Sequence, residues 1–329
     1  MSPAVPLTTL RVAGRVCVHF VLDLVEVGRS DRDLMDDLIL LTIIQANLEP
    51  LSRDLELQRR YAAVDAPPPD ELRRPVSINA VANALRFPYE TVRRRVTLMA
   101  ADGICEIGPR GVQVSARSLT APAHVAVLHA NYDKVRALYI RLRRIGFLAA
   151  ADAPADPWSP PALPVRAVAR ISGDYFLRMM EPLTLNIGDL VRGLLLLSIA
   201  KGNTEGLQDH ERGTEDPGPA GYVDDSKRRP ISVATLAARL NVPQETARRH
   251  VAHLVESGRC VRESAGVVMP AAEYARLEIV KLMHANQIHL QRMFAALAQL
   301  GVVEAWERSV AETEADAEIA TRFRDAEPA

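Results

Sequence analysis

Apolar residues recur at helical spacing along most of this chain, and one stretch of the pattern occurs twice. Residues 73–105 (RRPVSINAVANALRFPYETVRRRVTLMAADGIC) align without a gap with residues 228–260 (RRPISVATLAARLNVPQETARRHVAHLVESGRC), at an offset of 155 residues. The same offset pairs residues far outside these stretches, such as Arg11 with Arg166. We therefore predict a mainly α chain in which a whole domain is repeated.

Within each copy, the pattern predicts two helices joined by a tight turn. A serine precedes the first helix and can cap it, a proline stands at the start of the second helix, and a glycine follows that helix. These residues are Ser77, Pro88 and Gly103 in the first copy and Ser232, Pro243 and Gly258 in the second. Two helices so close together predict a helix-turn-helix over about residues 77–102 and 232–257.

A short β-hairpin is predicted after each helix-turn-helix. Short runs rich in β-branched and apolar residues flank a turn, which is built around Gly108-Pro109-Arg110-Gly111 in the first copy and Glu263 to Gly266 in the second. The hairpins are expected over about residues 104–115 and 259–270.

The segment LAARLNVPQETARRHVAHLVESGRCVRE, within residues 231–269, has the order of helix, turn, threonine-containing helix, glycine and hairpin. It resembles the winged helix-turn-helix of bacterial transcription regulators, especially those of the IclR and Crp types. The resemblance implies that the second helix of each copy enters the DNA major groove and that the hairpin is the wing. It predicts two tandem winged helix-turn-helix domains with flanking long helices and short β-hairpin wings.

These elements divide the chain into four segments. Residues 1–150 hold the first helical domain and residues 166–301 the second, with a Pro/Ala-rich linker at residues 151–165 between them. Residues 302–329 are acidic and lose clear apolar periodicity, so we expect a frayed helix or a disordered tail there.

Two long helices, at residues 122–146 and 271–301, carry more apolar surface than local docking requires. They are expected either to pack the two copies together about an internal pseudo-twofold axis or to join two chains as a homodimer. His129 and His284 lie at matching positions on these helices. An effector pocket or a dimer seam is one role for the two histidines, and hydrogen-bonded packing is the role that we favour.

The face of each second helix that points away from the core supplies the candidate DNA-reading residues. The resemblance places these helices in the major groove, where arginine suits guanine and glutamine suits adenine. The candidate base-reading residues are Tyr89, Thr91, Arg93, Arg94, Gln244, Thr246, Arg248 and Arg249. The candidate phosphate contacts are Arg73, Arg74, Arg110, Lys227, Arg228 and Arg229. Because Tyr89 aligns with Gln244 and Arg95 with His250, the two half-sites need not share a sequence.

Charge supports this interpretation only locally. The formal net charge of the chain is −1, which by itself gives no sign of a nucleic-acid partner. Around the first helix-turn-helix, however, the local charge is about +5, enough to neutralise several phosphates. The contributing residues are Arg73, Arg74, Arg86, Arg93, Arg94 and Arg95 against Glu90. The second copy repeats the cluster with Lys227, Arg228, Arg229, Arg239, Arg248 and Arg249 against Glu245.

Composition indicates a protein of the reducing cytoplasm. The three cysteines form no metal-type pair and cannot all be joined in disulfides, and Cys105 and Cys260 are expected to be small buried hydrophobes. The N-terminal residues make a poor signal peptide. The most apolar stretch, residues 190–200, is too short to cross a bilayer, so no membrane partner is expected.

Sequence motifs give no support for catalysis. The chain contains no Gly-rich phosphate loop, G-x-S-x-G elbow, H-E-x-x-H or C-x-x-C, so no catalytic residue, metal or cofactor is expected. The prediction is a regulator that binds double-stranded DNA. Two alternatives stay open: a non-catalytic winged-helix adaptor that binds an acidic protein surface, and a sensor with a small-molecule effector pocket around Phe20, Tyr175 and Phe176.

Overall fold

The structure is a computed structural model that describes residues 7–148, 158, 162–207 and 223–309. These residues are mainly helical and carry two small antiparallel sheets of two strands each, so the mainly α prediction is confirmed. Most of the predicted linker at 151–165 and the predicted tail beyond residue 309 lie outside the described residues. Within the described part, no single helix is long and apolar enough to span a membrane. Helices α8 (Val165–Ile187) and α9 (Leu190–Gly202) meet that criterion only as a pair, which is bent by 95°.

The two halves of the chain contain closely similar elements in the same order. The first half consists of α1 (Leu7–Val27), α2 (Leu34–Ser52), α3 (Leu55–Arg60), η1 (Asp70–Leu72), α4 (Ile78–Leu85), α5 (Tyr89–Ala101), β1 (Cys105–Gly108), β2 (Gly111–Val114), α6 (Ala116–Thr120) and α7 (Pro122–Arg144). The second half consists of α8 (Val165–Ile187), α9 (Leu190–Gly202), η2 (Asp225–Lys227), α10 (Val233–Leu240), α11 (Gln244–Glu256), β3 (Val261–Glu263), β4 (Gly266–Val268), η3 (Ala271–Ala275) and α12 (Leu277–Gln299). The long helix predicted over 271–301 is instead divided at Arg276 into η3 and α12.

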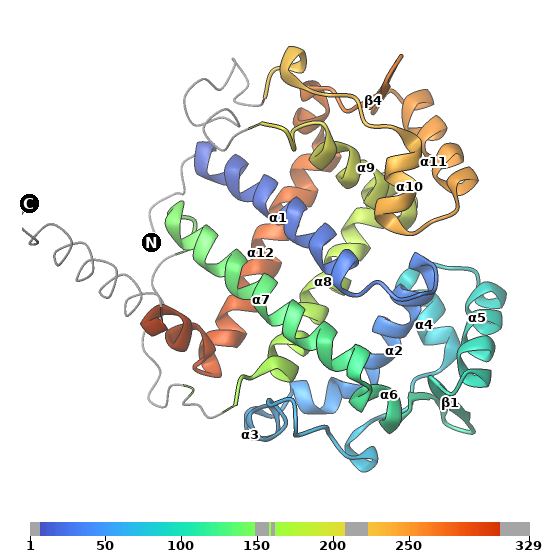
Figure 1. The fold of residues 1–329 in the computed structure, drawn as a ribbon, viewed down its shortest axis with the longest axis vertical. Coiled ribbons are helices and arrows are strands. Elements are labelled where there is room, and N and C mark those ends of the chain that lie inside the picture. Colours follow the sequence, from blue (N-terminus) through green and yellow to red (C-terminus); the bar gives the residue numbers. More distant parts are fainter. Residues whose placement is uncertain (1–6, 149–157, 159–161, 208–222, 310–329) are drawn as a thin grey trace, which may run out of the picture.

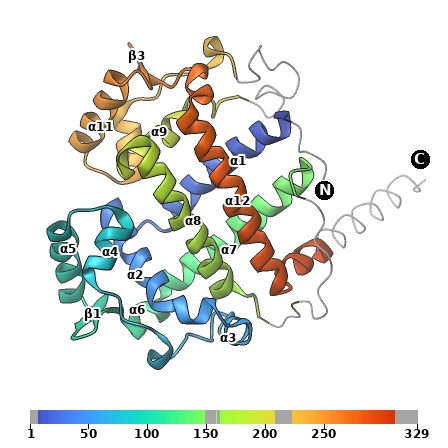
Figure 2. The ribbon, with the colours of Figure 1, turned by 180° about the vertical axis from the view of Figure 1, so that it is seen from behind.

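Each half presents a compact group of two helices and a hairpin. Helices α4 and α5 with strands β1 and β2 form unit 1, and helices α10 and α11 with strands β3 and β4 form unit 2. Figure 1 shows both units on the same side of the molecule, unit 2 above unit 1, and Figure 2 shows the same arrangement from behind. The long helices α1, α7, α8 and α12 form the scaffold beside them.

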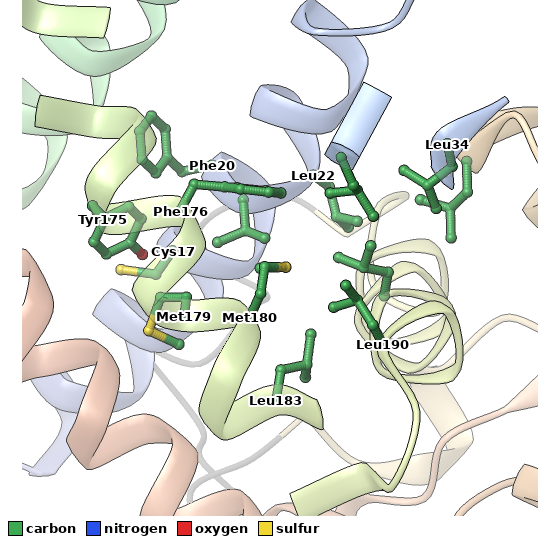
Figure 3. Packing of buried hydrophobic residues seen from close by; sticks show 14 of the residues in the cluster. Cys17, Phe20, Leu22, Leu34, Tyr175, Phe176, Met179, Met180, Leu183 and Leu190 are labelled. Atoms are coloured by element: carbon green, nitrogen blue, oxygen red, sulfur yellow. The ribbon is translucent and has the colours of Figure 1, made fainter. Parts of the chain in front are cut away.

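The first helix of each half packs against the second helix of the other half. Helix α1 packs against α9, and α8 packs against α2, while α1 and α8 also pack against the last helices of their own halves, α7 and α12. The buried rings of Phe20 on α1 and Tyr175 on α8 have centroids 5.8 Å apart. Figure 3 shows the two rings next to each other, with Cys17 beside Tyr175. The two halves therefore share one hydrophobic core.

Two buried arginines tie α8 to the first half of the chain. The guanidinium of Arg166 donates to the carbonyl oxygens of Val64 (3.0 Å) and Leu119 (3.1 Å). The guanidinium of Arg170 donates to two further carbonyl oxygens, at 2.8 Å and 3.1 Å, in the segment that ends at Tyr61. Burial and the charge of Arg166 lower the pKa of Arg170 to about 10. Arg170 therefore stays charged at neutral pH, and its bonds to carbonyl oxygens compensate for the lost water.

The matching histidines of α7 and α12 do not have the packing role that we favoured for them, because His129 and His284 are both exposed. The asparagines two residues later take that role instead. Asn131 Nδ2 donates to the Ser172 hydroxyl of α8 (2.9 Å), and Asn286 Oδ1 accepts from a buried tyrosine hydroxyl of α8 (2.6 Å). Both long helices are therefore joined to α8 by a hydrogen bond inside the core.

Residues 302–309 differ from the expected frayed or disordered tail. They form a helix in which Val302, Val303 and Trp306 are buried. The indole N–H of Trp306 donates to the Tyr132 hydroxyl of α7 (2.8 Å), and the Trp306 and Tyr139 rings have centroids 5.7 Å apart. This segment belongs to the packed scaffold because its apolar side chains cover the aromatic residues of α7.

An asparagine near the end of each apolar second helix holds the hairpin of its half. Asn47 is 1% exposed, and its Nδ2 donates to the carbonyl oxygens of Arg74 (2.8 Å) and Val112 (3.1 Å). Its Oδ1 accepts from the N–H of Val114 (2.9 Å). Asn203 on α9 makes the same three bonds with the equivalent backbone groups of the second half. Each amide thus joins a scaffold helix to both sides of its unit.

We expect Asn47→Ala to lower the free energy of unfolding by about 3 kcal/mol, because two carbonyl oxygens and one N–H in the interior lose their partner. Asn83→Ala, on the exposed side of α4, is the control and should change stability by less than about 0.5 kcal/mol. Chemical denaturation followed by circular dichroism measures both. Equal stability of the two variants would contradict the proposed role of Asn47.

A pH dependence is expected from His124, in the first turn of α7. Burial and the charge of Arg166 lower its pKa to about 4, from an ordinary value of 6.5. The folded state then binds this proton less tightly than the unfolded state, so the stabilising contribution is complete above about pH 6.5 and is lost as the pH falls toward 4. Between pH 7 and pH 4 the protonation of His124 should therefore lower the free energy of unfolding by on the order of 2 kcal/mol, and His124→Gln should not show this decrease. Unfolding free energies measured from pH 7 to pH 4 test this, and parallel profiles for the two proteins would refute it.

Candidate nucleic-acid interface

The first helix of each unit starts and ends as its sequence predicts. The hydroxyl oxygens of Ser77 and Ser232 each accept from the backbone N–H three residues later, at 3.1 Å, and so cap α4 and α10. These helices end at Arg86 and Asn241, whose φ angles of 55° and 50° are left-handed. Pro88 and its counterpart follow as N-caps, one residue before the position predicted for them. The chain thereby turns sharply into α5 and α11.

Helices α5 and α11 bury one face and expose the other. Val92, Val96 and Met99 of α5 are each 0% exposed, as are the three equivalent residues of α11. The opposite side exposes Tyr89, Arg93 and Arg94 of α5 and Gln244, Arg248 and Arg249 of α11, and Thr91 and Thr246 beside them are half-buried. The structure thus brings the candidate base-reading residues together, at equivalent positions of the two units.

On each of these faces one arginine pairs with a glutamate of the preceding turn. Arg93 Nε lies 2.9 Å from Glu90 Oε2, and Arg248 Nη2 lies 2.7 Å from Glu245 Oε1. The hydrogen bond from Arg248 lowers the pKa of Glu245. Such exposed pairs contribute little to stability, so both arginines can exchange the carboxylate for another anion at low cost.

Arg95, which the sequence grouped with the cationic cluster, has a different role. Its guanidinium donates to Asp33 (2.7 Å and 2.8 Å) and to Asp36 (2.7 Å), at the start of α2. The equivalent residue of unit 2 is His250, whose Nδ1 lies 3.6 Å from Asp189 Oδ1 at the start of α9. Burial is the main cause that lowers the pKa of His250. These residues anchor α5 and α11 to the scaffold rather than face outward.

The phosphate contacts predicted for Arg73 and Arg228 are wrong, because these side chains are only 4% and 6% exposed. The Arg73 guanidinium donates to the Val114 carbonyl oxygen and pairs with Asp70. The Arg228 guanidinium lies 5.2 Å from the centre of the Tyr274 ring. The other candidate phosphate contacts, Arg74, Arg110, Lys227 and Arg229, are exposed.

Each hairpin is held against the start of its unit by a backbone bridge. Val76 pairs with Val112 in unit 1, and Ile231 pairs with Val267 in unit 2. At Gly111, φ is +126° and the carbonyl group of Val76 leaves no room for a Cβ atom, so glycine is required there. The bridge fixes the hairpin to unit 1, and Arg110 at the hairpin turn therefore belongs to the same rigid unit as the exposed face of α5.

The residues that position the two faces were not predicted from the sequence. Asn47 and Asn203 had a usable signal, since each directly follows an apolar stretch of helical spacing, one in each half. The partners of Arg95 had none, because Asp33 and Asp36 lie far from it in sequence and meet it only in the folded chain. Cys105 and Cys260 are buried, as predicted, and burial raises the pKa of Cys105 to about 11 and that of Cys260 to about 12.

Comparisons with protein-family models, with curated proteins and with solved structures found no match for this chain. Within the described residues, no group of three or more His, Cys, Asp or Glu side chains is placed to hold a metal ion. A function for the chain therefore has to be inferred from the exposed faces of units 1 and 2.

We expect Arg95→Ala to lower the free energy of unfolding by about 2–4 kcal/mol, because Asp33 loses its cation and Asp36 keeps only Arg32, at 3.8 Å. Arg94→Ala is the matched control on the same helix and should change stability by less than about 0.5 kcal/mol, since Arg94 is exposed. Denaturant titration separates the two. A similar small effect for both variants would show that the ion pairs at Arg95 do not anchor α5.

Proposed function

We propose that the chain is a transcription regulator that binds double-stranded DNA with sequence specificity. Units 1 and 2 are two winged helix-turn-helix modules that arose by an internal duplication, α5 and α11 are their recognition helices, and the hairpins are their wings. Cytoplasmic residence suits a chain whose three cysteines are buried free thiols.

One observation carries this proposal: two equivalent helices expose the two arginines of the same Thr-x-Arg-Arg sequence, and both helices lie on one side of the molecule (Figure 1). Their apolar faces are fully buried, so the arginines are presented by rigid elements rather than by loops. An arginine-rich face that occurs once fits an ordinary solvated surface. Two such faces, held on one side by a shared core, fit two successive contacts along a duplex.

The exposed side chains differ between the two units in a way that matters for base recognition. Arginine donates in bidentate fashion to guanine, which suits Arg93 and Arg94 in unit 1 and Arg248 and Arg249 in unit 2. Gln244 suits adenine, whereas the equivalent residue of unit 1 is Tyr89. The proposed operator is therefore asymmetric, with half-sites whose centres lie about 34 Å apart or a multiple of that distance.

The proposed phosphate contacts are the exposed cations around these helices. Arg74 precedes α4 and Arg110 lies at the hairpin turn of unit 1, and Lys227 and Arg229 precede α10 in unit 2. Since phosphate contacts release counterions, binding should weaken steeply as the salt concentration rises.

The test is binding of the purified chain to the duplex upstream of its own gene and to a random duplex, at about 50 mM and 200 mM salt. The double variant Arg248→Ala, Arg249→Ala should lose about 30-fold or more in affinity for the upstream duplex, because each arginine contributes on the order of 1–3 kcal/mol. Fluorescence anisotropy with labelled duplexes measures the affinities.

The matched control removes two exposed arginines of the scaffold, in the double variant Arg144→Ala, Arg292→Ala. This variant has the same net charge as the test variant, and its affinity should stay within about twofold of the original. Equal losses in both variants would mean that total charge alone drives binding. No binding at low salt by the folded protein would refute the proposal and favour a winged-helix adaptor for an acidic protein surface.

A further inference from the structure

A cavity of about 100 Å³ lies between α1, α8, α9 and α12, next to unit 2. Its walls are mostly apolar and include four methionines, which adapt their shape to a ligand more readily than branched side chains do. The aromatic residues around which the sequence placed an effector pocket, Phe20, Tyr175 and Phe176, do not line it and pack in the neighbouring core instead.

Arg228 lines this cavity and has an unsatisfied hydrogen-bond donor. Its Nη2 donates to the Val223 carbonyl oxygen (3.1 Å), and its Nε lies 3.1 Å from Asp225 Oδ1. Its Nη1 is buried and has no hydrogen-bond partner. A buried donor without an acceptor is unfavourable, so a ligand that supplies an acceptor to this N–H gains affinity.

The first half of the chain shows which acceptor Arg228 lacks. Arg73, the counterpart of Arg228, directs its Nη1 to the carbonyl oxygen of Val114. In the second half, the counterpart of Val114 is Met269, and Met269 lines the cavity. The cavity therefore lies beside the arginine that has lost its internal acceptor.

The equivalent place in the first half is filled. There α7 packs along α8, and the side chain of Gln45 lies so close to Gly173 that no Cβ atom would fit. On the cavity side, Val18 and Lys201 stand at the corresponding positions, and both line the cavity. The hollow thus lies where the residues of the two halves differ.

The charge of the lining selects the kind of ligand. The lining contains Lys201 and Arg228, and it contains no aspartate or glutamate. Arg11 and Arg15 also line it, but both are already engaged in interactions of their own. Lys201 also lies 3.2 Å from Asp23, outside the lining. Apolar walls with cations at the edge favour a ligand that has an apolar body and an anionic end.

We propose that this cavity binds a small molecule made of an apolar chain and a carboxylate, and that the carboxylate accepts from Arg228 Nη1. Arg229, the next residue, donates its N–H to the Asn203 carbonyl oxygen (3.0 Å), and the Asn203 side chain holds the hairpin of unit 2. A ligand bound in the cavity therefore alters the contact between the scaffold and unit 2. This contact in turn changes the affinity of unit 2 for DNA. This regulatory step rests on the proposed function, whereas carboxylate binding does not.

Octanoate is the probe, because its apolar chain and single carboxylate suit the size and charge of the cavity. Titration calorimetry of the full chain should show one site with a dissociation constant below about 100 µM, and 1-octanol should bind about tenfold more weakly. Arg228→Met should weaken octanoate binding by about tenfold or more. Arg73→Met removes the equivalent guanidinium of the first half and should leave octanoate binding unchanged.

A second variant decides the matter if Arg228→Met does not fold. Met283→Trp keeps Arg228 and fills the cavity, so it should abolish octanoate binding while circular dichroism shows an intact fold. No octanoate binding, or binding that survives both variants, overturns the inference. The anisotropy assay for DNA, with and without octanoate, separates the two proposals: DNA binding without octanoate binding refutes only the cavity, and octanoate binding without DNA binding refutes only the regulator.

Discussion

The architecture depends on the exchange of the first helices between the two halves. Because α1 packs against α9 and α8 packs against α2, neither half can complete its core without the other. The buried guanidinium groups of Arg166 and Arg170 reinforce this exchange, since their acceptors are carbonyl oxygens of the other half. From that shared core, Asn47 and Asn203 extend the connection to the hairpins. The exposed faces of α5 and α11 are therefore held in one relative orientation by a continuous series of buried contacts.

Equivalent positions in the two halves have taken different roles within this common plan. Arg95 is bound by two carboxylates, whereas its counterpart His250 faces a single one at a longer distance. The Nη1 of Arg73 has an acceptor inside the protein, whereas the Nη1 of Arg228 has none and belongs to a residue that lines a cavity. At both positions unit 2 therefore lacks a partner that unit 1 has. The second half is thus the half in which a bound molecule has the most to stabilise.

Features specified by neighbouring residues were predictable from the sequence, and features specified by distant contacts were not. Serine caps, the tight turns and the hairpins follow from local chemistry, so the bounds of α4, α5, α10 and α11 agreed with the structure. The burial of Arg73 and Arg228 depends on acceptors that the folded chain supplies, such as the Val114 carbonyl oxygen. The acidic composition of the last residues predicts a tail for residues 302–309. Their burial depends on contacts with the distant helix α7, such as the hydrogen bond from Trp306 to Tyr132. The exposed arginine faces were predictable because helical spacing separates them from the apolar side.

Joining the two units in one covalent chain has a consequence for how the molecule behaves on dilution. Two separate subunits part from one another when their concentration falls below the dissociation constant of their interface, and any property that needs both is then lost. Here the linkage is intramolecular, and the exchanged helices cannot separate without unfolding the shared core. A single copy of this protein therefore carries both faces in their fixed arrangement, however few copies surround it.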